Sequence, residues 1–215
     1  MPPILDVAAA TAALRRDPIL GSFVERVGSV NTGRHQRTSF EALARAIVFQ
    51  QLAGAAASTI HGRVVSALGG RVTADAILAT PDEPLRAAGL SAAKLAALRD
   101  LAQKSTDGTV PLRSLGRLED EEIIARLVTV RGIGRWTAEM FLLFQLRRPD
   151  VWPVGDLGVR AGYARLHGLE ATPTEREIGP LGDRFRPWRS AAAWYCWQAV
   201  ALLPPVRGGG GATEA

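Results

Sequence analysis

The sequence has a single cysteine, Cys196, among its 215 residues. One thiol cannot form an intramolecular disulfide, a multi-thiolate zinc site or a four-cysteine iron–sulfur cluster. No apolar run approaches the roughly 20 residues that a membrane-spanning helix needs, and the amino terminus lacks the charged and apolar regions of a signal peptide. We therefore expect a cytoplasmic protein with no membrane partner.

Lysine is also scarce. Only Lys94 and Lys104 occur, so the other 24 of the 26 basic residues (26 minus 2) are arginines, whose planar guanidinium suits phosphate contact. Against 21 acidic residues the net charge is +5, which suits a polyanionic partner without requiring one. Charge alone thus leans toward nucleic acid without establishing it.

Alternating runs of β-branched residues, which are typical of strands, are scarce as well. Apolar residues instead recur at three- and four-residue spacing, and alanine and leucine dominate, as in amphipathic helices. A hydrophobic content of 47% in 215 residues suffices for one compact unit or two small lobes. We expect an all-α fold without internal repeats of roughly 20 to 50 residues.

Local signals predict where several helices start. Thr38-Ser39-Phe40-Glu41 is a capping box that opens a helix running through Gln50, after a loop over residues 31–34. Ser91 can cap a second helix. The acidic run at residues 119–122 starts a third, because carboxylates favour the positive end of the helix dipole. Acidic residues in such a run could also form the metal site of a nuclease, but we assign no catalytic role to them.

The second half of the chain is predicted to hold three more helices. A largely apolar helix over residues 135–147 is expected at the centre of the fold. Asp156 then starts another helix, and the last one carries Trp194 and Trp197, with Trp188 near its start. Residues 206–215 are expected to form a disordered tail.

The segment Val130-Arg131-Gly132-Ile133-Gly134 joins two of these helices. Glycines let such a turn approach a phosphate closely, and the amides that open the next helix point toward its oxygens. Binding of this kind is independent of base sequence. Taken alone, the motif is equally consistent with a tight structural turn.

The residues around this turn form a longer pattern. The string Gly132-Ile133-Gly134-Arg135-Trp136-Thr137-Ala138 is followed by Asp156, 20 residues after Trp136 (156 minus 136). With Ala46–Leu52, Gly89–Lys94 and Arg186–Arg189 the pattern covers roughly residues 38 to 200. It resembles the helix-hairpin-helix (HhH-GPD) DNA glycosylase superfamily, and within it the AlkA-type alkylbase glycosylases (DNA-3-methyladenine glycosylases).

The sequence departs from the family pattern at two positions. Arg131 stands where the family often has proline, which is compatible with the hairpin geometry. Met140 stands where some members place an aromatic residue of the base pocket, so the substrate range is less defined. We also expect no amino-terminal β domain of the kind that the longer AlkA-type enzymes have.

By this resemblance Asp156 corresponds to the essential aspartate of the family. An aspartate at a helix start is also an ordinary N-cap, and the roles are compatible because a helix start stabilises an ionised carboxylate. Cleavage of a glycosidic bond builds oxocarbenium charge on the sugar, which a fixed carboxylate stabilises while orienting the attacking water. An N-alkylated purine leaves as a neutral base, so a second, acid-donating carboxylate is less necessary.

Bifunctional members of the superfamily cut the DNA strand with a Schiff-base lysine that lies two residues after the second hairpin glycine. Trp136 occupies this position, and Lys94 and Lys104 lie far from it in the sequence. The resemblance therefore implies base excision without AP lyase activity, by a monofunctional enzyme.

Trp136 and Trp188 are candidates for the walls of a pocket that holds the flipped base, because electron-rich rings attract a cationic base. Met140, one turn after Trp136, would share that face. Core packing is the alternative for both tryptophans, and we assign Trp194 and Trp197 to the core.

Further residues are expected to contact DNA. In family terms Gln50 or Gln51, with Leu52 beside it, enters the gap left by the extruded nucleotide; we favour Gln51, although both amides could simply end their helix. The expected DNA-binding residues are Gly132, Ile133, Gly134, Arg135, Thr137, Gln50, Gln51, Leu52 and Lys94.

The hairpin of this family also holds a structural Na⁺ or K⁺ ion through backbone carbonyls. Here these would belong to Val128, Val130 and Ile133, and carbonyls carry no side-chain signature that the sequence could test. We predict no other cofactor and no catalytic metal. The histidines are scattered and are expected to be surface or packing residues; they are His35, His61 and His167.

The resemblance implies a helical barrel over residues 36–156 that faces a second helical lobe of residues 1–35 and 157–205 across a cleft. We predict a monomer, acting at the nucleoid, that excises N-alkylated purines such as 3-methyladenine or 7-methylguanine from double-stranded DNA in base excision repair. A glycosylase for a deaminated or oxidised base is one alternative. A non-catalytic DNA-binding module that kept the hairpin is the other.

Overall fold

The computed structural model describes residues 2–33 and 38–206. Every regular element in these two stretches is helical, which confirms the all-α prediction. No helix in the same stretches is long and apolar enough to cross a membrane. The predictions for Arg34, for His35 and for a disordered tail from residue 207 onward concern positions outside the described residues.

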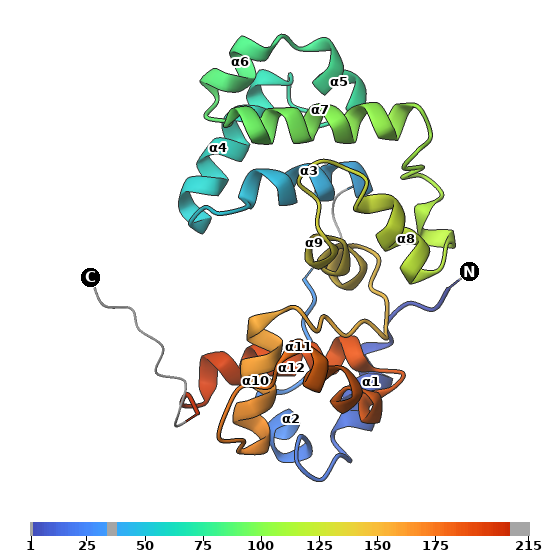
Figure 1. Cartoon of the computed structure of the whole chain (residues 1–215), viewed down its shortest axis with the longest axis vertical. Coiled ribbons are helices and arrows are strands. Elements are labelled where there is room, and N and C mark those ends of the chain that lie inside the picture. Colours follow the sequence, from blue (N-terminus) through green and yellow to red (C-terminus); the bar gives the residue numbers. More distant parts are fainter. Residues whose placement is uncertain (1, 34–37, 207–215) are drawn as a thin grey trace. The chain divides into compact units, whose positions relative to one another are not determined.

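The chain divides into two compact units, and Figure 1 labels the helices of each. Unit 1 comprises residues 1–2 and 34–146, and unit 2 comprises residues 3–33 and 147–215. The division falls at Leu146 rather than at the expected residue 156, so Asp156 belongs to unit 2. Hydrogen bonds from distant positions of the chain tie this segment to unit 2, because the Arg147 carbonyl accepts from the Leu5 amide and the Arg148 carbonyl accepts from the Ser190 hydroxyl.

Unit 1 is built on two long helices, α3 (Ser39–Phe49) and α7 (Ala92–Thr106), which pack against each other and lie side by side in Figure 1. Leu43 and Ile47 of α3 and three leucines of α7 are buried, so this pair forms the centre of the unit. The other elements are α4 (Gly54–Ala67), α5 (Ala74–Ala79), α6 (Asp82–Ala87), the 3-10 turn η1 (Leu115–Arg117), α8 (Asp120–Leu127), α9 (Arg135–Met140) and the π-helical segment η2 (Phe141–Gln145).

The predicted helix starts in unit 1 are confirmed. The Thr38 hydroxyl accepts a hydrogen bond from the Glu41 amide, and the Glu41 carboxylate accepts one from the Thr38 amide, which completes the capping box of α3. The Ser91 hydroxyl accepts from the Lys94 amide at the start of α7. The acidic run lies in the first turn of α8, where its charges favour the helix dipole.

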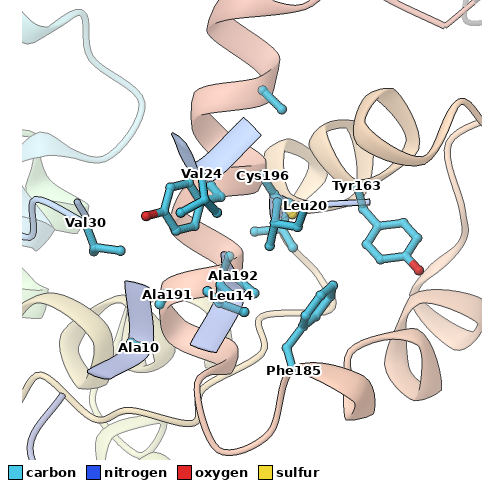
Figure 2. Packing of buried hydrophobic residues seen from close by; sticks show 14 of the residues in the cluster. Ala10, Leu14, Leu20, Val24, Val30, Tyr163, Phe185, Ala191, Ala192 and Cys196 are labelled. Carbon is cyan, nitrogen blue, oxygen red and sulfur yellow. The ribbon is translucent and has the colours of Figure 1, made fainter. Parts of the chain in front are cut away.

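Unit 2 is built around α10 (Leu157–His167) and α12 (Arg189–Leu202). These helices approach closely because α10 has glycine where they touch: a Cβ atom on Gly162 would lie 1.9 Å from the Cys196 carbonyl oxygen. Small residues of α12 and apolar side chains of α1 and α2 fill the core around Cys196, as Figure 2 shows. The other elements are α1 (Val7–Leu14), α2 (Gly21–Val27), α11 (Glu175–Leu181) and the 3-10 turn η3 (Asp183–Phe185).

Candidate functional site

Asp156 is the N-cap of α10, as the sequence predicts. Its carboxylate Oδ1 accepts a hydrogen bond of 2.8 Å from the Val159 amide. Only 8% of the residue is exposed, which is unusual for a carboxylate. The amides that open a helix have no acceptor within the helix, so a helix start stabilises negative charge at this position. The aspartate is therefore both an N-cap and a buried, fixed anion.

Trp197 holds the same carboxylate from the facing helix. Its indole Nε1 donates a hydrogen bond of 2.9 Å to Asp156 Oδ1. Gly158 makes room for the ring, since a Cβ atom there would lie 2.8 Å from Trp197 Cδ1 and 3.0 Å from Asp156 Oδ1. Trp197 packs against the core, as expected, and its contact with the aspartate is a feature that the sequence did not predict.

The loop that leads to Asp156 is anchored to the start of α12. Arg189 Nε donates to Asp150 Oδ1 at 2.8 Å, and the Ser190 hydroxyl accepts from the Val151 amide at 2.9 Å. The indole of Trp152, which is 7% exposed, donates to the Ile178 carbonyl. These bonds fix the backbone on the amino-terminal side of Asp156, so the carboxylate does not depend on a flexible loop.

Trp188, the other predicted pocket tryptophan of unit 2, is the N-cap residue of α12 and packs partly buried against the core. Trp194 is also partly buried and meets the Tyr195 ring edge to face. Its assignment to the core is therefore confirmed. A pocket role for Trp188 stays a prediction, whereas Trp197 is the tryptophan of this unit that contacts the aspartate.

In unit 1 the hairpin turn follows α8 and ends at the start of α9. Val130 and Ile133 are buried and anchor the turn, and the Ile133 amide donates to the Val130 carbonyl. Gly132 has a φ of +77°, a left-handed conformation that costs other residues free energy. Gly134 is the N-cap of α9. The glycines of the motif therefore shape an exposed turn, with the amides of a helix start next to it.

Gln50, the C-cap of α3, reaches this turn although it lies 82 positions earlier in the chain. Its side-chain Nε2 donates to the Gly132 carbonyl at 2.9 Å. The next residue, Gln51, has a left-handed φ of +55°, and Leu52 is 37% exposed. The two glutamines therefore differ: one braces the hairpin, and the other projects from a tight exposed turn.

The residues that follow the hairpin differ widely in exposure. Trp136 is 49% exposed on the first turn of α9, and Met140 is half-buried one turn later. Thr137 is buried, so a contact between this residue and a phosphate would use its backbone amide. An exposed indole beside the hairpin is compatible with the predicted pocket role, which stays a prediction.

Two of the predicted DNA-binding side chains make internal contacts instead. The Arg135 guanidinium donates to the carboxylates of Glu121 and Glu139, and the bond to Glu121 is the main reason that the pKa of Arg135 is raised. Lys94 Nζ donates to the Val48 carbonyl at 2.7 Å, and burial lowers the pKa of Lys94. Contacts of these two residues with DNA stay predictions.

The histidines described in the structure pack against aromatic rings. His61 meets the Phe49 ring edge to face at 6.0 Å, and His167 stacks on Tyr163 at 3.8 Å. Among residues 2–33 and 38–206 no group of three or more histidine, cysteine or acidic side chains is arranged to hold a metal ion. Burial strongly raises the pKa of the Cys196 thiol, which makes it a poor nucleophile.

Comparison with known proteins relates these two sites to one family. The model of the HhH-GPD superfamily, described as base excision DNA repair proteins, matches residues 44–184. This range includes the hairpin and Asp156. DNA-3-methyladenine glycosylase 1 of Schizosaccharomyces pombe is 39% identical over 192 residues, which are 86% of this chain and 84% of the relative.

Two experimental structures support the same relationship. The 3-methyladenine DNA glycosylase of Schizosaccharomyces pombe in complex with abasic DNA is 37% identical, with a TM-score of 0.79 over 90% of this chain and 97% of that one. The DNA-3-methyladenine glycosidase of Bacillus halodurans is 32% identical, with a TM-score of 0.82 over 92% of this chain and 90% of that one.

Proposed function

The chain belongs to the HhH-GPD superfamily of base excision DNA repair proteins, and we propose that it is a DNA-3-methyladenine glycosylase that excises N-alkylated purines from double-stranded DNA. One observation carries the proposal: Asp156 is a buried carboxylate at a helix start, held by the Val159 amide and the Trp197 indole. Relatives that match most of the chain are named for this activity.

The geometry around Asp156 suits hydrolysis of a glycosidic bond. Positive charge develops on the sugar as the bond to the base breaks, and a carboxylate that is already fixed needs no reorganisation to stabilise that charge. Two donors hold Oδ1 in place. An N-alkylated purine is itself cationic and leaves as a neutral base, so one carboxylate can serve the reaction.

The decisive variant is Asp156→Asn, with Asp6→Asn as its matched control. Asp6 is also a helix N-cap, since its carboxylate accepts from the Ala9 amide, but it is exposed. We expect the parent and Asp6→Asn to release free methylated purines from methylated duplex DNA. Asp156→Asn should lose roughly 10²–10³-fold in rate, the usual effect of removing one group that stabilises transition-state charge, while its DNA affinity is retained.

Three outcomes would contradict the proposal. Release of no base by the parent, with DNA binding intact, would indicate a non-catalytic binding module. Full activity of Asp156→Asn would exclude a catalytic role for Asp156. Faster release of hypoxanthine, uracil or 8-oxoguanine than of methylated purines, measured on matched duplexes, would assign the enzyme to another lesion.

We further propose that the enzyme leaves the DNA strand uncut. Trp136 occupies the position of the lyase lysine in this family, and the amines of Lys94 and Lys104 bond to main-chain carbonyls within unit 1. Purified protein should therefore yield intact abasic strands that break only when heated with alkali. A covalent protein–DNA complex trapped by borohydride would contradict this.

A structural Na⁺ or K⁺ ion at the hairpin is a further part of the proposal. The backbone carbonyls of Val128, Val130 and Ile133 would hold it, and neutral oxygens of this kind fit a monovalent cation. Such an ion would stiffen the turn and place positive charge near a phosphate. DNA affinity should then be higher in KCl or NaCl than in choline chloride at equal ionic strength, and equal affinities would argue against the ion.

We also propose that Gln51 enters the DNA stack when the target base is flipped. Its left-handed backbone and the exposed Leu52 beside it are features of a projecting turn, and a wedge of this kind offsets part of the unstacking cost. Gln51→Ala should slow excision more than it weakens binding to DNA that already lacks a base. Unchanged excision would contradict the assignment.

A further inference from the structure

Two side chains of α7 hold the hairpin turn in place. Asp100 Oδ2 accepts a hydrogen bond of 2.7 Å from the Arg131 backbone amide and one of 2.8 Å from Lys104 Nζ. The same Lys104 amine donates to the Thr129 carbonyl at 2.5 Å. Two backbone groups on the amino-terminal side of Gly132 are thereby tied to one ion pair.

The pairing is favoured by the sequence of α7 itself. Asp100 and Lys104 are four residues apart on one helix face, the spacing at which an acid and a base interact. About a quarter of each side chain is exposed, 29% for Asp100 and 25% for Lys104, so the pair is better shielded from water than an ordinary surface ion pair. Partial burial raises the pKa of Asp100, but the bonds from Lys104 and the Arg131 amide outweigh it, and the net pKa is lowered.

We propose that Asp100 and Lys104 are positioning residues that set the conformation of the hairpin turn for DNA binding. Arg131 brings a backbone N–H that needs an acceptor, and Asp100 supplies it. A proline at position 131 would lack this N–H and would fix its own φ. The ion pair therefore satisfies and holds the backbone at Arg131, where a proline would have no N–H to satisfy and would be held by its ring.

The charge of Lys104 is a necessary part of this arrangement. An unpaired carboxylate beside a phosphate-binding turn would repel DNA. Lys104 neutralises Asp100 while holding the Thr129 carbonyl. The turn thus gains a strong acceptor for its amide without a net negative charge next to the DNA.

Charge alone and the proposed role of the Asp100–Lys104 pair predict opposite effects of Asp100→Ala on DNA affinity. Removal of an acid from a DNA-binding protein strengthens binding if charge alone matters. We expect the reverse: a loss of about tenfold in affinity for a labelled duplex with a tetrahydrofuran abasic analogue, because the Arg131 amide loses its acceptor. Asp107→Ala is the matched control, since this acid is the C-cap of the same helix and bonds the Thr109 amide. It should bind as well as the parent or better.

A double-mutant cycle with Arg131→Pro tests the mechanism. In the Arg131→Pro background no amide is left without an acceptor, so adding Asp100→Ala should change the affinity by less than about threefold. An equal loss in both backgrounds would overturn the proposal. So would an affinity of Asp100→Ala that matches or exceeds that of the parent.

This inference rests on the proposed function only in that the hairpin binds DNA. Two measurements distinguish a failure of the inference from a failure of the proposed function. Amide hydrogen exchange over residues 128–134 in the free protein should accelerate in Asp100→Ala and not in Asp107→Ala, whether or not the protein is a glycosylase. Single-turnover excision at saturating enzyme should be unchanged, so the loss is confined to binding. Asp100→Asn, which keeps an acceptor oxygen, should recover most of the protection. Exchange in Asp100→Ala that is as slow as in the parent, or exchange in Asp100→Asn that is as fast as in Asp100→Ala, would overturn the proposal.

Discussion

The hairpin of unit 1 and the aspartate of unit 2 are held in place by different means. The hairpin is exposed, and side chains from α3 and α7 bond its main-chain groups at Gly132, Arg131 and Thr129. The aspartate is buried where two helices touch, and its own side chain receives the bonds. A turn that binds phosphate needs accessible amides, whereas a carboxylate that stabilises charge needs shielding from water.

The two sites should therefore respond differently to substitutions. In unit 2 the position of the carboxylate depends on the close contact of α10 with α12 at Gly158 and Gly162. Substitutions that disturb this contact should therefore lower the rate of catalysis. In unit 1 the turn is fixed by a few polar bonds at the surface, so substitutions there should change DNA affinity with little effect on the fold.

The largest effect is expected for Gly162→Ala. The added Cβ would lie 1.9 Å from the Cys196 carbonyl oxygen, so α10 and α12 must separate, at a cost of about 3 kcal/mol or more. Gly62→Ala on α4 is the control, because nothing lies within 4 Å of its added Cβ and alanine favours a helix interior by about 0.5–1 kcal/mol. Thermal unfolding should show the first variant destabilised and the second slightly stabilised. Equal melting temperatures would refute the close-contact argument.

Trp197→Phe tests whether the buried contact serves catalysis. Phenylalanine keeps most of the ring packing but cannot donate to Asp156, and a hydrogen bond to a charged group contributes about 1.5–3 kcal/mol. Single-turnover excision should therefore fall about tenfold to hundredfold, with DNA affinity unchanged. Trp194→Phe, on the same helix, should leave the rate intact. A loss of affinity without a loss of rate would place Trp197 in binding instead.

Gly132→Ala tests the hairpin in the same way. The left-handed φ of +77° should cost alanine about 1–2 kcal/mol, and the strain should be relieved by distortion of the turn. Gly108→Ala is the matched control, since Gly108 has a φ of +85° and open space around its added Cβ. Both variants should lose similar stability in chemical denaturation, but only Gly132→Ala should bind DNA more weakly. Equal DNA affinities of the two variants would show that the hairpin is not part of the DNA-binding surface.

How far the sequence predicted these sites depends on the distance over which each contact acts. The helix starts at Thr38, Ser91 and Asp156 were predictable, because capping groups and the amides they bind lie within three residues. The bond from the Trp197 indole to Asp156 spans 41 positions, and the bond from the Arg131 amide to Asp100 spans 31. Local patterns carry no information about such pairs.

One signal for the aspartate site was nevertheless present. Gly158 and Gly162 lie four residues apart on α10, a spacing that marks one helix face, and three consecutive alanines follow Ser190 near the start of α12. Small residues on two helices permit a close approach, which could have paired the helices and brought Trp197 toward Asp156. The structure divides the chain at residue 146, and the sequence did not indicate this for a related reason, because the anchoring bonds of residues 147–151 come from distant positions.

The smallest effect concerns the buried side of unit 2 and its response to pH. His167 stacks on Tyr163, its Nδ1–H donates to the Tyr163 carbonyl, and its Nε2 is buried with no hydrogen-bond partner among the described residues. Burial lowers the pKa of His167, and the bond to Tyr163 offsets this only in part. Protonation would thus leave a buried N–H without an acceptor.

The sign of the effect follows from proton uptake. Above about pH 6.5, the ordinary value for histidine, neither the folded nor the unfolded chain binds the proton, and the contribution of His167 to stability is fully present. As the pH falls below that value the unfolded chain takes up the proton first, so the free energy of unfolding decreases until the lower, folded-state pKa is passed. The melting temperature of His167→Gln should fall less between pH 7.5 and pH 5 than that of the parent. An equal fall in the two proteins would show that the pH response does not come from His167.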